Sequence, residues 1–396
     1  MSWRLRCFFI SMGLFLVWPM LVLMASQLHP SLAKLASARD IWMWLPIIFL
    51  LFPLSSWKEN LHRGIGQTPI SFLVFVAFLL GSLLWSTPEL SPKILSIRQF
   101  ISPLVLWLIS RWVLNSEDIP KILSFFYRLG WWFMALGIVL YLFPIWNWMD
   151  IGPFVAAKNL KLNDEGVIEF MYEPILGGMP RMSSVLLDPI NLGHFWMVLF
   201  ALDWKQPRLG WWGRVLYVTA IGFTFCKGAV LQFGVAMIGW TRLLPRWMKA
   251  MAIGGMGLVL VLGASFHPGI QAHLGGLVNS FRTITVFGHG LGSVGNIVGR
   301  YSTAANLGIG DTFVGMVIGQ LGIVGFCIWL WSMWEMFRRS KNELLLQCLF
   351  AGQLFVSIFS ETAYYATSMV LLLVLMGATS EKKPNKKSRF RGIQRS

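Results

Sequence analysis

The feature that most constrains this chain is its series of long apolar runs, separated by short polar segments. Of its 396 residues 56% are hydrophobic and only 13% are charged, whereas about a quarter of the residues in a soluble domain are charged. A run of roughly 20 apolar residues can cross a bilayer as a helix, which satisfies its own backbone hydrogen bonds. The sequence therefore excludes an ordinary soluble domain and indicates an all-α, polytopic integral membrane helical bundle.

Hydropathy predicts about twelve membrane-spanning helices. Pro103, Asp188 and Lys227 interrupt or flank the fourth, sixth and seventh of them. The predicted spans are 7–27, 41–56, 68–86, 99–114, 122–145, 183–202, 211–226, 228–244, 248–266, 312–334, 343–359 and 362–378. The chain then divides into helices 1–5 (1–145), an outer loop (146–182), helices 6–9 (183–266), a second outer loop rich in glycine and histidine (267–311), helices 10–12 (312–378) and a basic cytoplasmic tail (379–396).

The distribution of Lys and Arg predicts the orientation, because these residues accumulate in cytoplasmic loops. With a cytoplasmic N-terminus, 23 of the 33 basic residues fall in inner segments and 10 in outer ones, while the 17 acidic residues divide into 7 inner and 10 outer. The net charge of +16 is then cytoplasmic, as are both termini. The charge indicates topology and no nucleic-acid partner.

Neither a cleaved leader nor a disulfide framework is expected. Arg4 and Arg6 before the first apolar run suit a signal peptide, but its removal would leave an odd number of spans and spoil the charge asymmetry. The four cysteines lie in or beside spans without CxxC spacing, so the sequence predicts no zinc site and no metal.

The two outer loops have room for a functional site, since long loops in a compact protein are usually functional. The sharpest motif in the first loop begins at Arg181. Asp188, Asn191 and His194 follow at i, i+3 and i+6, close to one helical face. Arg181 could be a snorkelling cation and Asp188 a helix-start signal. A functional cluster is favoured, because ionisable residues within membrane depth are costly.

Two other outer segments carry candidate residues. Lys227 is a lone cation in the tight turn Cys226-Lys227-Gly228-Ala229, which is either purely topological or part of a site on the side of Arg181. The loop Gly288-His289-Gly290-Leu291-Gly292 has no preceding strand and no GK[ST], which argues against nucleotide binding. It is either a flexible turn or a set of N–H groups for an anionic or sugar ligand, with His289 able to exchange a proton.

Asp311 stands where the tenth span opens. An acidic residue there is an ordinary helix cap, although its carboxylate is also a candidate base. The glycines at 315, 319, 322 and 325 have small-xxx-small spacing, which predicts close helix packing.

In order along the chain, these motifs resemble the O-antigen polymerase and O-antigen ligase superfamily of polytopic membrane glycosyltransferases. Residues 181–193 resemble the family's "Arg, small residues, apolar, x-Pro-x-Asn-x-Gly" segment, and Phe225 through Ala229 its "Ser-Arg-Gly-Ala" turn, with Lys227 in place of Arg. Residues 288–292 and 311–325 resemble its "Gly-x-Gly-x-Gly" loop and the span that follows. The resemblance covers roughly residues 175–340.

The resemblance implies an enzyme at the outer, periplasmic face of the bacterial inner membrane. Its donor would be a polyprenyl-diphosphate-linked glycan in the lipid bilayer, and it would need no metal or other cofactor. Cations at headgroup level would stabilise the diphosphate leaving group, and a base would activate the acceptor hydroxyl. Candidates for the diphosphate are Arg181, Lys227, Arg282 and Arg300, and candidates for catalysis are Arg181, His289, Asp311 and Asp188.

Within the family, polymerisation of repeat units is favoured over ligation to lipid A–core. Ligases typically carry a His just before the tenth span, where this chain has Gly310-Asp311. A flippase and a chain-length regulator of the same pathway are possible partners.

A transporter is the competing function. The segment 56–63 lacks the charged motif of major facilitator porters, and transporters tend to place ionisable sites at the bilayer midplane, whereas here these residues gather at one end of the bundle. A membrane scaffold would not account for cations beside two long outer loops.

Overall fold

Long apolar segments with helical backbone make up most of this chain in its computed structural model. The structure describes residues 3–40, 42–43, 68–163, 166–173, 178–241, 245–263, 268–296, 307–340 and 343–380. It is all-α. The main helices are α1 (Trp3–Leu28), α4 (Ile70–Ser82), α5 (Leu90–Val113), α6 (Ile119–Leu142), α8 (Pro189–Lys205), α9 (Trp211–Thr224), α10 (Lys227–Trp240), α11 (Arg246–Gly263), α12 (Pro268–Arg282), α14 (Phe313–Arg339), α15 (Leu344–Val356) and α16 (Ala366–Thr379).

Short elements connect these helices. A long 3-10 helix, η1 (Pro30–Asp40), follows α1, and the first outer loop holds the short helix α7 (Gly152–Lys158) and a hairpin of β1 (Tyr172–Glu173) with β2 (Met179–Pro180). The other 3-10 turns are η3 (Ser116–Asp118), η4 (Ile145–Asn147), η5 (Glu169–Met171), η7 (Ser184–Leu186) and η8 (Thr362–Tyr364).

Five helical segments in the described part of the chain are long and apolar enough to cross a membrane: Trp3–Leu28, Leu90–Val113, Ser116–Leu142, Phe313–Arg339 and Thr362–Thr379. Two shorter helices, α4 and α15, are also apolar. The protein is therefore an all-α membrane protein. The number of twelve spans and the cytoplasmic termini stay predictions.

The predicted spans match the positions of the observed helices along the chain, but the predicted boundaries often differ from the observed ones. Each predicted span other than 41–56 overlaps a helix, and apart from Trp42 and Met43 that segment lies outside the described residues. Helix α5 begins at Leu90 and not at residue 99, and α8 begins at Pro189 and not at residue 183. The second outer loop contains helix α12, which hydropathy alone did not predict.

Helix α16 forms the centre of the bundle. It packs against α5 and α8, and every residue from Ala366 to Gly377 is buried. Gly377 permits the approach of α5, because a Cβ atom at this position would lie 2.7 Å from the Trp107 carbonyl oxygen. Gly352 of α15 likewise permits the approach of α10, because a Cβ atom at this position would lie 2.6 Å from the Gln232 carbonyl oxygen.

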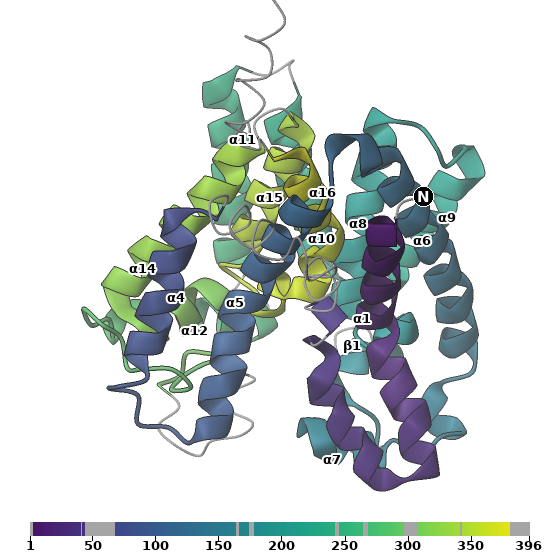
Figure 1. The fold of residues 1–396 in the computed structure, drawn as a ribbon, viewed down its shortest axis with the longest axis horizontal. Helices are drawn as coiled ribbons and strands as arrows, with labels where there is room; N and C mark the ends of the chain where they lie inside the picture. Colours follow the sequence, from purple (N-terminus) through teal and green to yellow (C-terminus); the bar gives the residue numbers. More distant parts are fainter. Residues whose placement is uncertain are drawn as a thin grey trace, which may run out of the picture.

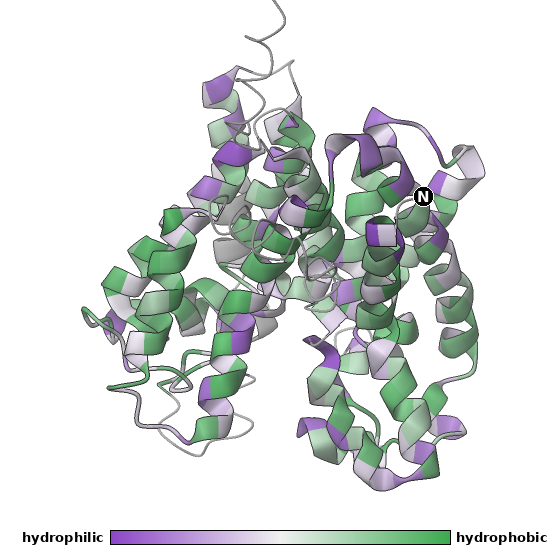
Figure 2. Cartoon of the chain, viewed as in Figure 1, coloured by the Kyte–Doolittle hydropathy of each residue, from purple (hydrophilic) through white to green (hydrophobic). Residues whose placement is uncertain are grey.

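Several connecting segments lie at two opposite ends of the molecule (Figure 1). The turns 114–118 and 206–210 lie at the upper end, while the loops 83–89 and 143–151 lie at the lower end. Figure 2 shows hydrophobic residues along most of the helices, with many hydrophilic ones towards these ends. These four segments thus separate according to the side predicted for each, and we call the lower end the outer end.

Helix α14 is broken in its middle. Gly322 has φ 67° and ψ −167°, so the N–H groups of Ile323 and Val324 turn away and donate to the carbonyls of Thr285 and Val286, each at 3.1 Å. The carbonyls of Gly319 and Gln320 would have accepted these two N–H groups in a regular helix. N–H groups of the second outer loop donate to these two carbonyls instead.

Candidate functional site

Asp188 caps the first turn of α8. Its Oδ1 accepts the N–H groups of Ile190 at 2.9 Å and Asn191 at 3.1 Å, and its Oδ2 accepts the Asn191 side-chain amide at 2.6 Å. Pro189 occupies the first helical position, where its fixed φ is favourable. Burial raises the pKa of the Asp188 carboxyl, although the Asn191 N–H group and the charge of Arg181 act in the opposite direction. Asp188 is therefore the N-cap of α8, as the helix-start alternative for this motif expected.

Arg181 holds the end of α9. Its guanidinium donates from all three nitrogens to backbone carbonyls, Nε to Thr224 at 2.9 Å, Nη2 to Phe225 at 3.3 Å and Nη1 to Phe170 at 3.4 Å. The last carbonyls of a helix have no partner within the helix, and a cation there is favoured by the helix dipole. Arg181 therefore fixes the turn between α9 and α10 against the first outer loop.

The first two motifs of the sequence meet at this turn. A Cβ atom on Gly193 of α8 would lie 2.5 Å from the Cβ atom of Cys226, so only glycine permits this contact. Lys227, the first residue of α10, pairs with the buried Glu173 of β1, with Nζ and Oε1 3.2 Å apart. The Lys227 side chain remains 63% exposed, so it stays open to a ligand.

No described hydrogen bond joins His194 to Asp188 or Asn191, with which it was predicted to share a face. Its ring is fully buried, with Nδ1 2.8 Å from the Gln232 Oε1 atom of α10. It belongs to the packing of α8 against α10.

A second polar cluster surrounds Glu361, just before η8. The carboxylate is 3% exposed. Its Oε1 accepts the Gln99 side-chain amide at 2.9 Å and the Tyr365 hydroxyl at 3.1 Å, and its Oε2 accepts the Asn296 N–H group at 2.7 Å. Burial raises the pKa of this carboxyl, and the charge of Asp311 raises it further, while the donors lower it. Segments from three parts of the chain thus converge on one buried carboxylate.

Asp311 belongs to this second cluster and does not cap α14. The cap is Thr312, whose hydroxyl accepts the Gly315 N–H group at 3.1 Å, and the expectation of an ordinary cap at Asp311 is wrong. Asp311 instead has a left-handed backbone with φ 56°, and its carboxylate accepts a hydrogen bond from the Asn296 side-chain amide. Its backbone carbonyl lies 3.0 Å from the His273 Nδ1 atom.

The glycine loop completes the broken helix α14. The N–H groups of His289 and Gly290 donate to the carbonyls of Gly319 at 2.9 Å and Gln320 at 3.0 Å, and Gly292 donates to the Gln320 side chain at 3.0 Å. These N–H groups are therefore occupied within the chain. The His289 Nε2 atom bonds to the Thr283 carbonyl at 2.8 Å, so this nitrogen carries the proton and Nδ1 is the basic nitrogen.

A third group, missed in the sequence, joins η1 to α5. Arg98 and Asp40 form an ion pair with 2.8 Å between Nε and Oδ2, and Ser102 donates to the same oxygen at 3.4 Å. Arg39 lies on the other side of Asp40, with Nε 3.7 Å from Oδ1, and over the ring of Phe15 at 5.1 Å. Arg39 is also close enough to Asp188 for their charges to interact.

These groups form one continuous polar region in the outer half of the bundle. Arg98 and Gln99 are consecutive on α5, so the first pairs with Asp40 while the second donates to Glu361. The Ser368 hydroxyl lies within hydrogen-bond reach of the Asn191 Oδ1 atom and, at 2.7 Å, of the Thr362 carbonyl. The region thus extends from Asp188 to Glu361 across α8, α16 and α5.

Two further cations were predicted as diphosphate ligands. Arg282 is exposed at the C-terminus of α12. Arg300 lies outside the described residues.

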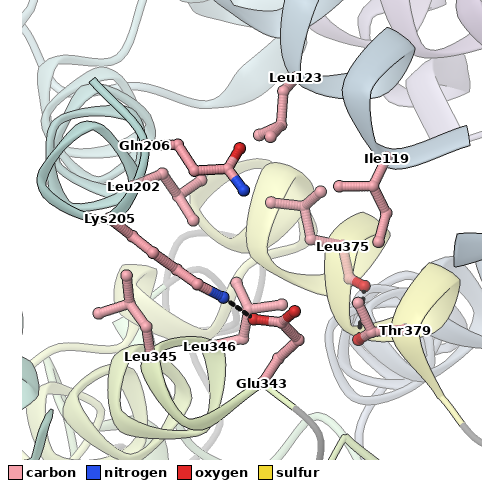
Figure 3. A pocket seen from close by; sticks show the side chains of 10 residues that line it. All are labelled: Ile119, Leu123, Leu202, Lys205, Gln206, Glu343, Leu345, Leu346, Leu375 and Thr379. Atoms are coloured by element: carbon pink, nitrogen blue, oxygen red, sulfur yellow. Dashed lines mark hydrogen bonds and ion pairs between the residues drawn. The ribbon is translucent and has the colours of Figure 1, made fainter. Parts of the chain in front are cut away.

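A small cavity of about 50 Å³ lies at the opposite, upper end, lined mainly by leucines (Figure 3). Lys205 of α8 forms an ion pair with Glu343 at its edge. The cavity contains none of the predicted site residues.

Arg39, Arg98, Gln99 and Glu361 were not singled out from the sequence. The charge count placed both arginines among the ten outer cations, and Glu361 follows a polar break between the last two spans. Their predicted position on the outer side was the only signal in the sequence. Which of these residues contact one another could be seen only in the folded structure. No protein-family model matches the chain, and no curated protein matches it.

Proposed function

We propose that this protein polymerises polyprenyl-diphosphate-linked oligosaccharide repeat units into a surface or secreted polysaccharide at the outer face of the bacterial inner membrane. In this proposal the chain crosses the membrane about twelve times, both termini are cytoplasmic, and the outer end faces the periplasm. The resemblance of its motifs to the O-antigen polymerase and ligase superfamily supports this choice.

The observation that carries the proposal is the adjacency of a buried carboxylate and a pair of arginines near the outer end. Arg98 pairs with Asp40 beside Arg39, and its neighbour Gln99 donates to Glu361. Burying ionised groups is costly, and such groups concentrate at functional sites. Glycosyl transfer from a diphosphate needs this pair of functions, namely cations for the leaving group and a base for the acceptor.

The reaction follows from these roles. The acceptor hydroxyl oxygen attacks the anomeric carbon of the donor, a new C–O bond forms, and the bond from that carbon to the phosphate oxygen breaks. The electron pair leaves with the polyprenyl diphosphate, whose charge the cations stabilise. Glu361 takes the hydroxyl proton, while His289, Asp311 and Asp188 remain the alternative bases from the sequence.

Ligation to another acceptor is the alternative within this chemistry, and it differs only in what supplies the hydroxyl. A transporter is disfavoured, because the polar region lies towards one end of the bundle and a transporter site is typically at the midplane. A flippase that delivers the donor and a chain-length regulator are the partners that such an enzyme requires.

The test is the surface-glycan profile of a deletion strain, resolved by size on a gel. Loss of long chains with single repeat units retained on the carrier or core is the expected result. Carrier-linked polymer that never reaches its acceptor would identify a ligase instead. Unchanged glycans with altered solute uptake would overturn the proposal in favour of a transporter. Complementation with the wild-type gene is the control.

A further inference from the structure

Helix α14 folds back on itself at Gly322. The ring centroids of Phe313 and Trp329 are 5.8 Å apart, whereas a straight helix would separate the Cα atoms of these two residues by about 24 Å. The residues before Gly322 therefore lie beside those that follow it. Only the second part of α14, residues 323–339, is then left to cross the bilayer.

This second part is too short to project beyond the lipid. It is about 26 Å long, while the hydrocarbon core of a bilayer is about 30 Å thick. Its C-terminal end carries Arg338 and Arg339, which both pair with Glu335. Charged groups are costly within the hydrocarbon, so this end lies at the headgroups. Ile323 at the other end then reaches no further than the opposite edge of the acyl chains.

Residues 284–287 of the second outer loop are fastened to that end of α14. The carbonyls of Thr285 and Val286 accept the N–H groups of Ile323 and Val324, each at 3.1 Å. The segment therefore lies at the same depth as Ile323. Non-helical backbone is tolerated at the edge of the acyl chains when its polar groups are bonded within the protein or reach water.

The side chains of this segment form an exposed apolar surface. Ile284, Val286 and Phe287 are 39%, 56% and 54% exposed. The Phe287 ring contacts that of Trp85, with 6.0 Å between the ring centroids, and Trp85 is also partly exposed. We call these four residues the apolar patch. A surface of this kind marks a site of contact with a membrane or with another protein.

The outward face of α14 indicates which of the two covers the apolar patch. Ile323, Leu330 and Trp334 are exposed and share one helical face at i, i+7 and i+11. In a membrane-crossing helix, such an apolar face contacts acyl chains. The apolar patch continues this face beyond Ile323, and a tryptophan at its edge is typical of the boundary between acyl chains and headgroups.

We propose that the apolar patch is inserted into the bilayer at the outer end and contacts acyl chains just below the headgroups. The patch thereby holds the glycine loop, which begins at Gly288, at the membrane surface. The second outer loop is then not wholly in water, as hydropathy predicted, because four residues are too few to register as a span. The inference depends neither on the proposed function nor on which side of the membrane the outer end faces.

The experiment places single spin labels on the full-length protein in phosphatidylcholine and phosphatidylglycerol vesicles. It compares collisions with O₂, which concentrates among acyl chains, and with a water-soluble nickel chelate. The ratio of O₂ to nickel collisions at Ile284→Cys and Val286→Cys should be several times that at Lys161→Cys, an exposed position in the first outer loop. Leu330→Cys, on the outward face of α14, is the lipid-facing control and should also have a high ratio.

The background for labelling replaces Cys327 and Cys348 and retains Cys7 and Cys226, which are buried and should not react. Helicity and thermal unfolding equal to those of the unlabelled protein show that each variant folds. As a second readout, a bimane label at Val286→Cys should be quenched most by lipids brominated near the headgroup.

Three results would overturn the inference. A collision ratio equal to that at Lys161→Cys would show that water covers the apolar patch. Few collisions with either reagent would show that protein covers it, and spin–spin broadening would then identify a second copy of this chain. Strongest quenching by bromines at the bilayer centre would contradict the position just below the headgroups.

Discussion

The carboxyl group of Glu361 is buried in a membrane protein, with three donors converging on it. Burial raises its pKa, and the charge of Asp311 adds to this effect. A raised pKa favours the protonated form in the folded state, so this group's contribution to stability falls as pH rises from the unfolded pKa through the folded one. A base of raised pKa also takes a proton more readily.

Replacing Glu361 with Gln should reduce polymer formation by about 100-fold or more, the usual contribution of a general base. The amide keeps the size of the side chain, and the protein should remain inserted and abundant on an immunoblot. Turnover of lipid-linked repeat units by the purified variant is the measurement. Wild-type turnover would show that Glu361 is not the base.

Removal of one donor to Glu361 provides a pH test. Tyr365→Phe deletes the hydroxyl bonded to Oε1 and so removes a contact that lowers the pKa of the carboxyl. Because the ionised form is the active base, activity should then begin to fall at a higher pH on the acidic side. Ser360→Ala, which removes a neighbouring hydroxyl that no described bond joins to Glu361, is the matched control. An unchanged acidic limb in Tyr365→Phe would contradict the assignment.

The break in α14 explains why the glycine loop has its sequence. The loop replaces the hydrogen bonds that the helix loses at Gly322, and non-helical backbone at membrane depth is tolerated only when its polar groups are satisfied in this way. A Cβ atom on Gly322 would lie 2.3 Å from the Gly288 nitrogen, and one on Gly288 would lie 2.2 Å from the Gln320 carbonyl oxygen. Glycine on both sides allows the loop and the helix to approach.

Gly322→Ala should therefore destabilise the protein. The positive φ alone costs about 1–3 kcal/mol for a residue with a side chain, and displacement of the loop adds to it. Thermal unfolding in nanodiscs is the measurement. Gly254→Ala is the control, because Gly254 lies in helix α11 with open space around its Cβ position, where alanine is favoured over glycine. Equal melting temperatures for the two variants would contradict the role of the break.

Hydropathy located the helices well and their ends poorly, for a physical reason. A window of apolar residues ends where polar residues begin, and the polar start of α5 contains Lys93 and Arg98. The start of α8 was placed too early, because residues 185–187 are apolar although Ser184–Leu186 form a 3-10 turn that ends at a left-handed Leu187. The helix ends that hydropathy misses are thus also those that carry part of the candidate site.

The candidate site was predictable only in part. The approach of Gly193 to the turn after α9 brings together two motifs that the sequence did single out. The ion pair between Asp40 and Arg98 joins residues 58 positions apart in the chain. The hydrogen bond between Gln99 and Glu361 joins residues 262 positions apart. Such pairings depend on how α5, η1 and η8 pack. Neither hydrophobic periodicity nor motif spacing carries information about that packing.

Connecting segments lie at two opposite ends of the whole molecule. Labelling one residue at each end tests the proposed orientation in the membrane. In a variant without cysteines, Lys161→Cys at the outer end should react with a membrane-impermeant maleimide in cells whose outer membrane is permeabilised. Asn115→Cys, in the turn before η3, should react only after lysis. Both positions are exposed. The reverse pattern would invert the orientation and place the polar region towards the cytoplasm.

Glycan transfer by the purified protein is the most direct test of the proposed function. The lipid-linked repeat unit that accumulates in a deletion strain can be extracted and supplied to the wild-type protein in proteoliposomes. A ladder of longer glycans, together with release of polyprenyl diphosphate in proportion to the linkages formed, is the predicted result. The ladder should be absent with Glu361→Gln and present with Lys205→Ala. An unchanged substrate in the presence of folded wild-type protein would contradict the proposal.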